Sequence, residues 1–192
     1  MSNEYLPLWT DPEYIAGKQQ IFLQVDQYLA GSRPKRILDI GCGYAHVSQM
    51  FQRKYGSDLW LLEGTRLSNT DQHTRKAKYG SVDNFQFYTD YANLESYWRS
   101  QEMLYTLVPA DQCLELDPNL KFDLIYSWIS CGYHYPVRTY RDLIVKHSDA
   151  RTIVIMDIRR KSLAAQSQDF DIIARLDGDG IQKKYRCHIQ VK

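Results

Sequence analysis

The chain has 192 residues, 44% of them hydrophobic and 24% charged, which suits one folded domain and excludes a disordered segment. Its 24 basic and 23 acidic residues give a formal net charge of +1, which argues against nucleic acid as a partner bound through bulk charge. The sequence has no apolar stretch long enough for a membrane span and no signal-peptide pattern at its N-terminus.

The four cysteines are scattered along the chain as Cys42, Cys113, Cys131 and Cys187, without a C-x-x-C pair. Such spacing fits reduced thiols better than a disulfide framework or a zinc site. We therefore expect a cytoplasmic protein, and its oligomeric state stays open.

The first half of the chain predicts helices alternating with strands. Phe22, Val25 and Leu29 recur at spacings of three and four residues, which predicts a helix from Pro12 to Gly31. Short apolar runs predict buried strands with helices between them. The elements expected next are a strand at 36–40, a helix at 45–55, a strand at 59–62, a helix at 68–79 and a strand at 85–89.

The second half continues the pattern and then changes rhythm. We expect a helix at 92–110, a loop at 111–121, a strand at 122–128, a helix from Pro136 and a strand at 152–156. After these, apolar residues alternate over 170–176 and 185–191, on either side of a glycine-rich turn at 177–180. Alternation around a tight turn predicts an antiparallel hairpin.

These elements predict an α/β fold, namely a Rossmann-like, doubly wound and mostly parallel sheet that ends in an antiparallel hairpin. We expect a single domain over residues 1–192. Within it, residues 1–33 would form an N-terminal helix and a lid that includes Trp9 and Tyr14, and residues 92–121 would lie near the substrate.

A glycine loop follows the first expected strand. Gly41 and Gly43 come directly after it, and Asp39 lies two residues before the first glycine. Glycines at a strand-to-helix junction let the backbone approach a ligand, and a carboxylate there favours a cationic one. Glu63 ends the next strand, where an acid binds the hydroxyls of a ribose. The alternative is a tight turn with Glu63 facing solvent.

Leu38-Asp39-Ile40-Gly41-Cys42-Gly43 resembles the first motif of the class I S-adenosylmethionine-dependent methyltransferases. The C-terminal hairpin is similar to the sixth and seventh strands of that family, which implies a sheet of seven strands. The resemblance extends from about residue 15 to the end of the chain, and it implies S-adenosyl-L-methionine as cofactor and S-adenosyl-L-homocysteine as product.

The resemblance also implies which residues bind the cofactor. The glycine loop would contact the methionine part, Glu63 the ribose, and Asp90 and Tyr91 the adenine. An equally simple role for Asp90 is to cap the next helix. The full set of expected cofactor-binding residues is Asp39, Gly41, Cys42, Gly43, Glu63, Gly64, Asp90, Tyr91 and Ser127.

The substrate would lie at the carboxyl ends of the strands, where the chain places a histidine among aromatic residues. His134 is the expected catalytic base, because an attacking hydroxyl must lose its proton. The expected substrate-binding residues are Trp128, Tyr133, Tyr135 and Arg159. The alternatives are a capping or packing role for His134, a core role for the aromatic residues and a solvated role for Arg159. No metal is expected, because only Asp157 is suitably placed to be a ligand.

We therefore expect an O-methyltransferase that acts on a small molecule, with a sugar or glycan as the first choice. The segment from Cys131 to Pro136 resembles small bacterial, phage and viral methyltransferases of glycan type. Two alternatives stay open: an inactive binding or scaffold module with the same fold, and an enzyme that methylates RNA or protein.

Overall fold

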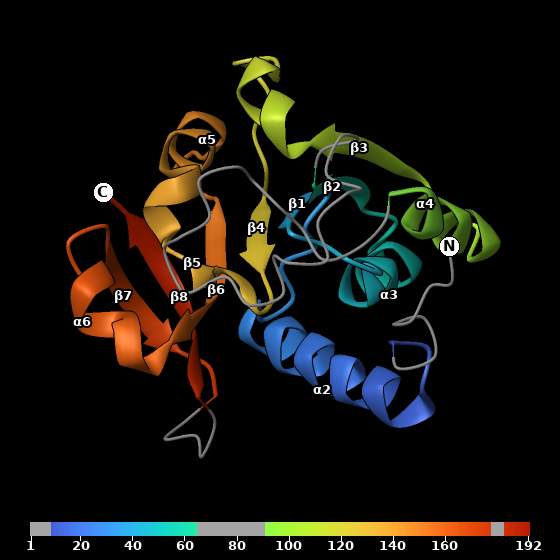
Figure 1. The fold of residues 1–192 in the computed structure, drawn as a ribbon, viewed down its shortest axis with the longest axis horizontal. Coiled ribbons are helices and arrows are strands. Elements are labelled where there is room, and N and C mark those ends of the chain that lie inside the picture. The colour runs from blue at the N-terminus through green and yellow to red at the C-terminus, as the bar shows by residue number, and fades with distance from the viewer. Residues whose placement is uncertain (1–8, 65–90, 178–182) are drawn as a thin grey trace.

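The computed structural model describes residues 9–64, 91–177 and 183–192. A mixed sheet of seven strands runs through the molecule in the order β3-β2-β1-β4-β6-β8-β7 (Figure 1). The pairs along β3-β2-β1-β4-β6 are parallel, whereas β8 is antiparallel to both β6 and β7. This arrangement confirms the Rossmann-like fold, the seven strands and the C-terminal antiparallel pair.

The bounds of the elements follow the predicted order for most of the chain. The strands are β1 (Arg36–Ile40), β2 (Asp58–Glu63), β3 (Tyr105–Pro109), β4 (Leu124–Ser127), β5 (Ser130–Tyr135), β6 (Ile153–Arg159), β7 (Phe170–Arg175) and β8 (Lys184–Val191). The helices are α2 (Pro12–Tyr28), α3 (His46–Tyr55), α4 (Tyr91–Ser100), α5 (Arg141–His147) and α6 (Leu163–Gln166), with 3₁₀ turns η2 (Ala110–Glu115), η3 (Val137–Tyr140) and η4 (Arg160–Ser162).

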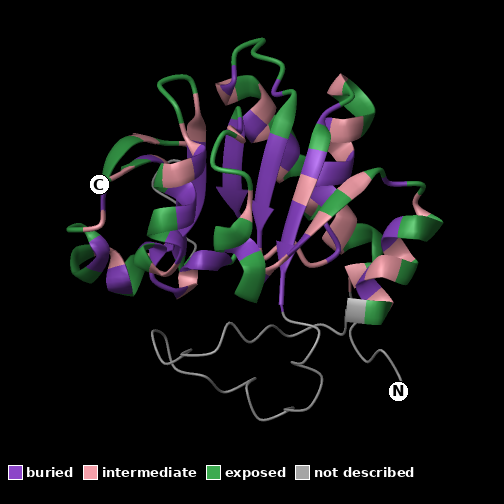
Figure 2. Ribbon diagram, turned by 90° about the horizontal axis from the view of Figure 1, so that it is seen from above, coloured by how far each residue is buried: buried purple, intermediate pink, exposed green. Residues whose placement is uncertain are grey.

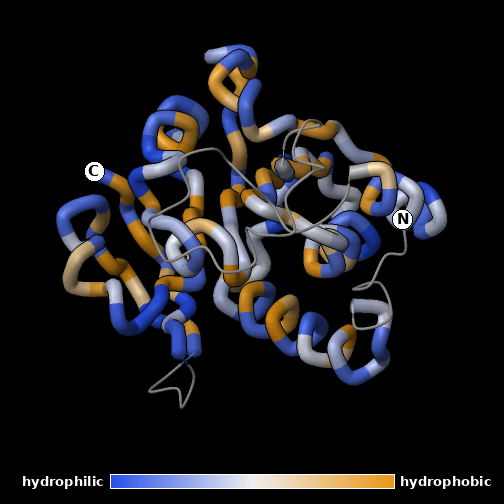
Figure 3. The backbone as a smooth tube through the Cα atoms, in the orientation of Figure 1, coloured by the Kyte–Doolittle hydropathy of each residue, from blue (hydrophilic) through white to orange (hydrophobic). Residues whose placement is uncertain are grey.

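Two apolar clusters cover the two faces of the sheet. Ile37 and Leu38 are neighbours in β1 but belong to different clusters, because successive strand residues point to opposite faces. One cluster includes residues of α2, α3 and α4, and the other includes residues of η3 and α5. Figure 2 shows the buried strands at the centre, and Figure 3 shows hydrophobic residues concentrated in them, with mixed character in the helices.

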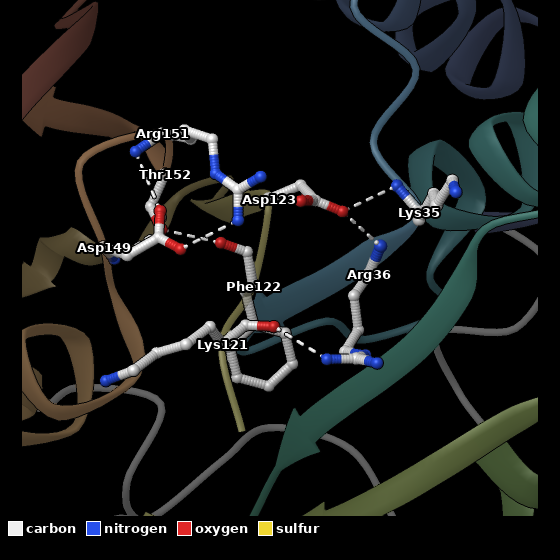
Figure 4. Close-up of polar contacts among 8 residues, drawn as sticks. All are labelled: Lys35, Arg36, Lys121, Phe122, Asp123, Asp149, Arg151 and Thr152. Carbon is white, nitrogen blue, oxygen red and sulfur yellow. Dashed lines mark hydrogen bonds and ion pairs between the residues drawn. The ribbon is translucent and has the colours of Figure 1, made fainter. Parts of the chain in front are cut away.

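The amino-terminal edge of the parallel strands is fixed by side-chain hydrogen bonds (Figure 4). Asp123 Oδ2 accepts from the backbone N–H groups of Lys35 and Arg36 at 2.8 and 2.9 Å. Thr152 Oγ1 donates to the Phe122 carbonyl oxygen at 2.7 Å. These contacts hold the beginnings of β1, β4 and β6 in register, and leave the opposite edge for the ligand-binding loops.

The predicted helix over 92–110 is wrong in its second half. Helix α4 ends at Ser100, and residues 105–109 form β3, which pairs in parallel with β2. The spacing of Leu94 and Trp98, both fully buried, is helical, but it does not continue into Tyr105–Pro109. The helix expected at 68–79 and the strand expected at 85–89 lie outside the described residues.

Two smaller predictions also need correction. Residues 130–135, expected in a loop at the sheet edge, form β5, and part of the loop expected at 111–121 is the 3₁₀ turn η2. The helix expected from Pro136 is divided into η3 and α5. Within the ranges that the structure describes, no helix has both the length and the apolar character needed to cross a membrane.

Candidate functional site

The glycine loop turns sharply between β1 and α3. Gly41 and Gly43 have φ angles of +70° and +50°, in the left-handed region that favours glycine. The N–H groups of Gly41 and Cys42 donate to the Leu62 carbonyl oxygen at 2.8 and 3.2 Å, which ties the loop to β2. A Cβ on Gly41 would lie 1.9 Å from Ser130 Oγ, so only glycine fits at this position.

Asp39 is a buried carboxylate directly below this loop, with an exposed fraction of 1%. Its Oδ2 accepts a hydrogen bond from Ser48 Oγ at 2.7 Å, and Ser48 also contacts the Tyr126 hydroxyl. Its Oδ1 has no hydrogen-bond partner among the described residues. Burial raises the pKa of Asp39 to about 7, which a cationic ligand would oppose.

Glu63 ends β2 and reaches back to the glycine loop. Its Oε2 accepts from the Gly43 N–H at 2.6 Å, and its Oε1 accepts from the Gly64 N–H at 3.3 Å. Burial raises the pKa of Glu63 to about 7, although these backbone hydrogen bonds oppose the shift. The Cys42 thiol lies 3.8 Å from Oε2 and is buried beside the two carboxylates, and burial raises its pKa.

Asp39 and Glu63 line the same cavity, which has a volume of about 330 Å³ and is here named the glycine-loop cavity. It lies at the carboxyl ends of β1 and β2, where open α/β sheets bind their ligands. The other lining residues are Trp9, Tyr14, Lys18, Gly41, Cys42, Gly43, Tyr44, Ala45, His46, Val47, Trp128, Ile129, Ser130, His134 and Tyr135.

Aromatic side chains form one wall of the glycine-loop cavity. The rings of Trp9 and Tyr44 meet edge to face at 4.9 Å, and Tyr44 is stacked with His46 at 6.2 Å. His46 Nε2 lies 2.9 Å from the Trp9 carbonyl oxygen, and burial lowers the pKa of His46 to about 4. A neutral His46 can therefore serve as part of a ligand-binding wall.

The sequence analysis missed Tyr44, His46 and Lys18 as lining residues. His46 and Tyr44 directly follow the glycine loop, so their position in sequence was a usable signal. Lys18 carried no such signal, because only the packing of α2 against α3 and the sheet brings it to the cavity. Trp9 and Tyr14, expected in a lid, do line the cavity.

His134 reaches the cavity from β5. Its imidazole is half-buried and meets the Tyr133 ring edge to face at 5.1 Å. Burial, with a smaller contribution from the Arg159 charge, lowers the pKa of His134 below its usual value. The imidazole is therefore neutral near pH 7 and can accept a proton.

Trp128 and Tyr135 also line the cavity, and both are buried. Trp128 is stacked with Tyr126 at 4.6 Å, and the Arg186 guanidinium lies 4.9 Å from the centre of the Trp128 ring. Trp128 Nε1 is buried without a hydrogen-bond partner among the described residues. Each aromatic side chain thus has a core role and a face toward the cavity.

Other predicted residues lie apart from the cavity lining. The buried Ser127 hydroxyl donates to the Ile40 carbonyl oxygen at 2.7 Å and accepts from the Cys131 N–H at 2.8 Å, so it joins β4 to β1 and β5. Gly64 contributes its N–H to Glu63. Arg159 lies 5.7 Å from the centre of the Tyr133 ring, and neither lines the cavity.

The segment expected beside an adenine needs a second candidate. Asp90 lies outside the described residues, and Tyr91 is the first residue of α4. The strand that pairs with β2 is β3, and Pro109 at its end is the register partner of Glu63. The chain beyond β3, which begins with Ala110 and Asp111, therefore follows the strand end next to Glu63.

The part of the chain that the structure describes holds no group of three His, Cys, Asp or Glu residues that could bind a metal ion. Asp157, the one carboxylate considered as a ligand, is fully buried and forms ion pairs with Lys184 and Arg186. The proposal of metal-independent chemistry therefore still depends on a direct test.

No protein-family model matches the chain, and no curated protein matches its sequence. Solved structures do match its fold. The chain is similar to the ribosomal protein L11 methylase from Lactobacillus delbrueckii subsp. bulgaricus, with a TM-score of 0.56 and 16% identity, over 92% of this chain and 79% of that one.

Two further structures share the fold. One is the N-methyltransferase NodS from Bradyrhizobium japonicum WM9 in complex with S-adenosyl-L-homocysteine, with a TM-score of 0.58, 10% identity and coverage of 98% of this chain and 91% of that one. The other is the T. thermophilus 16S rRNA N2 G1207 methyltransferase RsmC in complex with AdoMet and guanosine, with a TM-score of 0.59 and 12% identity. The match covers 95% of this chain but 43% of RsmC.

The chain therefore has the fold of the class I S-adenosylmethionine-dependent methyltransferases. At these identities the likeness concerns the fold alone, and a fold does not specify a substrate. The chemistry has to be inferred from the residues of the glycine-loop cavity.

Proposed function

We propose that the protein is an S-adenosylmethionine-dependent O-methyltransferase that transfers a methyl group to a hydroxyl of a small molecule. The observation that carries the proposal is the unpaired Oδ1 of Asp39 in a buried position on the glycine-loop cavity. A buried carboxylate oxygen without a partner is costly, and the ammonium group of a methionine moiety would supply its missing hydrogen bond.

The neighbouring residues fit the rest of the cofactor. Gly41 and Gly43 give the backbone room to approach the methionine part, and no atom lies within 4 Å of a Cβ built on Gly43. Glu63 lines the same cavity and has the lone pairs to accept hydrogen bonds from the two ribose hydroxyls. The register of β3 favours Asp111 as a further candidate for the adenine side, beside the earlier candidates Asp90 and Tyr91.

The bound cofactor would supply an electrophilic methyl group on a sulfonium centre. The protein would supply the rest: a dry cavity, an acceptor hydroxyl held in line, and a base for its proton. His134 is the proposed base, since it lines the cavity and its lowered pKa keeps it neutral near pH 7. In the transfer the hydroxyl oxygen forms its bond to the methyl carbon as His134 takes the proton.

A sugar or glycan is the proposed acceptor class. Trp128, Tyr135 and Tyr14 line the cavity, and aromatic rings pack well against the apolar faces of sugar rings. Tyr133 and Arg159 are proposed as contacts at the outer side of His134, where Arg159 lies over the Tyr133 ring. The four cysteines are free thiols, which supports a reducing, cytoplasmic location.

Two alternatives start from the same fold. The first is an inactive binding module, which the paired carboxylates and the glycine loop argue against. The second is methylation of RNA or protein, the substrates named for the RsmC and L11 enzymes. The near-neutral charge of the chain argues against RNA held by bulk electrostatics.

Calorimetry with S-adenosyl-L-homocysteine, followed by a radiolabelled methyl-transfer screen, tests the proposal. We expect micromolar or tighter binding, and label transferred to monosaccharides or glycans in preference to phenols, RNA or protein. Binding without transfer to any acceptor class would favour the inactive module. Absence of binding up to millimolar ligand would refute the methyltransferase proposal.

A further inference from the structure

A second cavity of about 640 Å³ adjoins the glycine-loop cavity. It is bordered by α2 on one side and by the first residues of β8 on the other, and we name it the basic groove. Its lining residues are Tyr14, Gly17, Lys18, Gln20, Ile21, Gln24, Ile129, Asp177, Lys184 and Arg186. Tyr14, Lys18 and Ile129 line both cavities, so the two form one continuous space for a ligand.

Cations outnumber carboxylates around the basic groove. The described residues contribute three cations, Lys18, Lys184 and Arg186, against Asp177 in the lining and Asp157 behind it. Lys184 and Arg186 are both buried, with exposed fractions of 7% and 5%. Buried charges are stable only when they are paired, so this excess of positive charge favours an anion in the groove.

Arg186 has its hydrogen bonds largely satisfied within the protein. Its Nε lies 3.0 Å from Asp157 Oδ1, and its Nη1 donates to Gln24 Oε1 at 2.6 Å. Asp177 Oδ2 accepts from the Arg186 backbone N–H at 2.8 Å. Arg186 therefore supplies charge to the groove and holds the Asp157 carboxylate in place.

The two lysines still have N–H groups to donate. Lys184 Nζ contacts Asp157 Oδ2, which is its one partner among the described residues. Lys18 Nζ lies 5.0 Å from the centre of the Tyr14 ring, and no carboxylate of the described residues forms an ion pair with it. Burial lowers the pKa of both lysines, and a bound anion would stabilise their charged forms.

We propose that the basic groove binds an anionic group of the methyl acceptor, through Lys18 and Lys184. The acceptor class is then a hydroxylated compound that carries a carboxylate or a phosphate, such as a sugar acid or a sugar phosphate. Its anionic end lies in the groove and its hydroxyl reaches past Tyr14 and Ile129 toward His134. This assignment of the acceptor rests on the proposed function, whereas the anion site itself does not.

Calorimetric titration of the full chain with glucuronate, inorganic phosphate and glucose tests the groove directly. Each titration is carried out with and without S-adenosyl-L-homocysteine, at low and at high ionic strength. We expect at least one of the anions to bind about tenfold or more tightly than neutral glucose, and to weaken as salt increases. A preference for glucuronate or for phosphate identifies the source of the anionic group.

Lys18→Met is the decisive variant, because Lys18 holds no ion pair whose loss would disturb the fold. We expect it to weaken anion binding by about tenfold. Lys161→Met is the matched control, since Lys161 is exposed and lines neither cavity. Lys18→Gln, with its neutral polar end, replaces the first variant if its melting temperature shows that Lys18→Met does not fold.

The proposal fails if both anions bind wild-type protein no more tightly than glucose does, or if the Lys18 and Lys161 variants bind the anion equally well. Failure of the methyltransferase proposal looks different. In that case S-adenosyl-L-homocysteine does not bind, while Lys18-dependent binding of the anion persists in its absence and still supports the groove.

Discussion

The Glu63 carboxylate accepts a 2.6 Å hydrogen bond from the Gly43 N–H, which joins the end of β2 to the glycine loop after β1. A ligand that contacts the loop therefore also contacts Glu63. We expect Glu63→Gln to weaken binding of S-adenosyl-L-homocysteine by roughly ten- to hundredfold, because a charged hydrogen bond is worth about 1.5–3 kcal/mol. Isothermal titration calorimetry measures the change.

Glu115→Gln is the control for this experiment, because Glu115 is exposed at the end of η2 and does not line the cavity. Its affinity should match that of the wild-type protein. If the Glu63 variant also bound as tightly as wild type, the assignment of Glu63 to the ribose would be wrong.

Asp39 gives a second prediction, which concerns stability and pH. Burial raises the pKa of Asp39 and of Glu63 to about 7, well above the value near 4 in an unfolded chain. Between these values the folded protein binds more protons than the unfolded chain, so stability falls as pH rises from about 4 to 7 and then levels off. Asp39→Asn removes one of the two titrating groups.

We therefore expect Asp39→Asn to melt higher than wild type at pH 8 by roughly a few degrees, and to lose this advantage near pH 4. The same variant should bind S-adenosyl-L-homocysteine at least about tenfold more weakly. Melting curves across this pH range test the first expectation. A difference in melting temperature that does not change with pH would contradict it.

The parallel strands were predictable because each is a short apolar run that ends at a glycine or a charged residue. Ile37–Ile40 and Leu59–Leu62 are examples, and both carry functional residues at their ends. Strand β3 was not, since Leu94, Trp98, Met103 and Leu107 are spaced as on one helix, and only pairing with β2 shows that the last of them belongs to a strand.

The cavity shows the same division between local and long-range information. Asp39, Gly41, Gly43 and Glu63 could be found from the motif alone, and the structure brings them together. Lys18 and the basic groove could not, because Lys18 and Lys184 are distant in sequence and meet only when α2 packs near β8.

A third prediction concerns the amino-terminal edge of the sheet, far from the glycine-loop cavity. Asp123 accepts hydrogen bonds from two backbone N–H groups, so Asp123→Ala should lower the free energy of unfolding by about 1–2 kcal/mol. Its affinity for S-adenosyl-L-homocysteine should not change. Asp142→Ala is the control, as the Asp142 side chain is 80% exposed and pairs with the adjacent Arg141. Equal denaturant midpoints for the two variants would contradict the role of Asp123.

A fourth prediction is that a chelator leaves methyl transfer unchanged. Asp157, the carboxylate at the end of β6, is already paired with Lys184 and Arg186, which disfavours a metal ion beside it. Activity should therefore be equal before and after dialysis against EDTA. Loss of turnover that magnesium restores would instead identify Asp157 as a ligand.

The last prediction concerns His134 as the base. If the imidazole removes the proton of the acceptor, His134→Ala should lower the rate of methyl transfer by roughly 10²–10⁴ while cofactor affinity stays nearly constant. His188→Ala is the matched control, because His188 lies outside both cavities and its Nδ1 contacts the Tyr28 hydroxyl at 2.8 Å. The control should retain the wild-type rate.

The pH profile separates a catalytic His134 from a structural one. Burial lowers the pKa of His134, so the neutral form dominates at pH 7 and is lost only as pH falls through this lowered value. At saturating cofactor and acceptor, kcat should be flat above neutral pH and fall on the acid side with a midpoint below the usual histidine value. Tyr133→Phe, which keeps the ring beside His134, should leave that midpoint in place. A His134→Ala enzyme that keeps the same acid limb, or more than about a third of the wild-type rate, would assign the proton transfer to another group or to water.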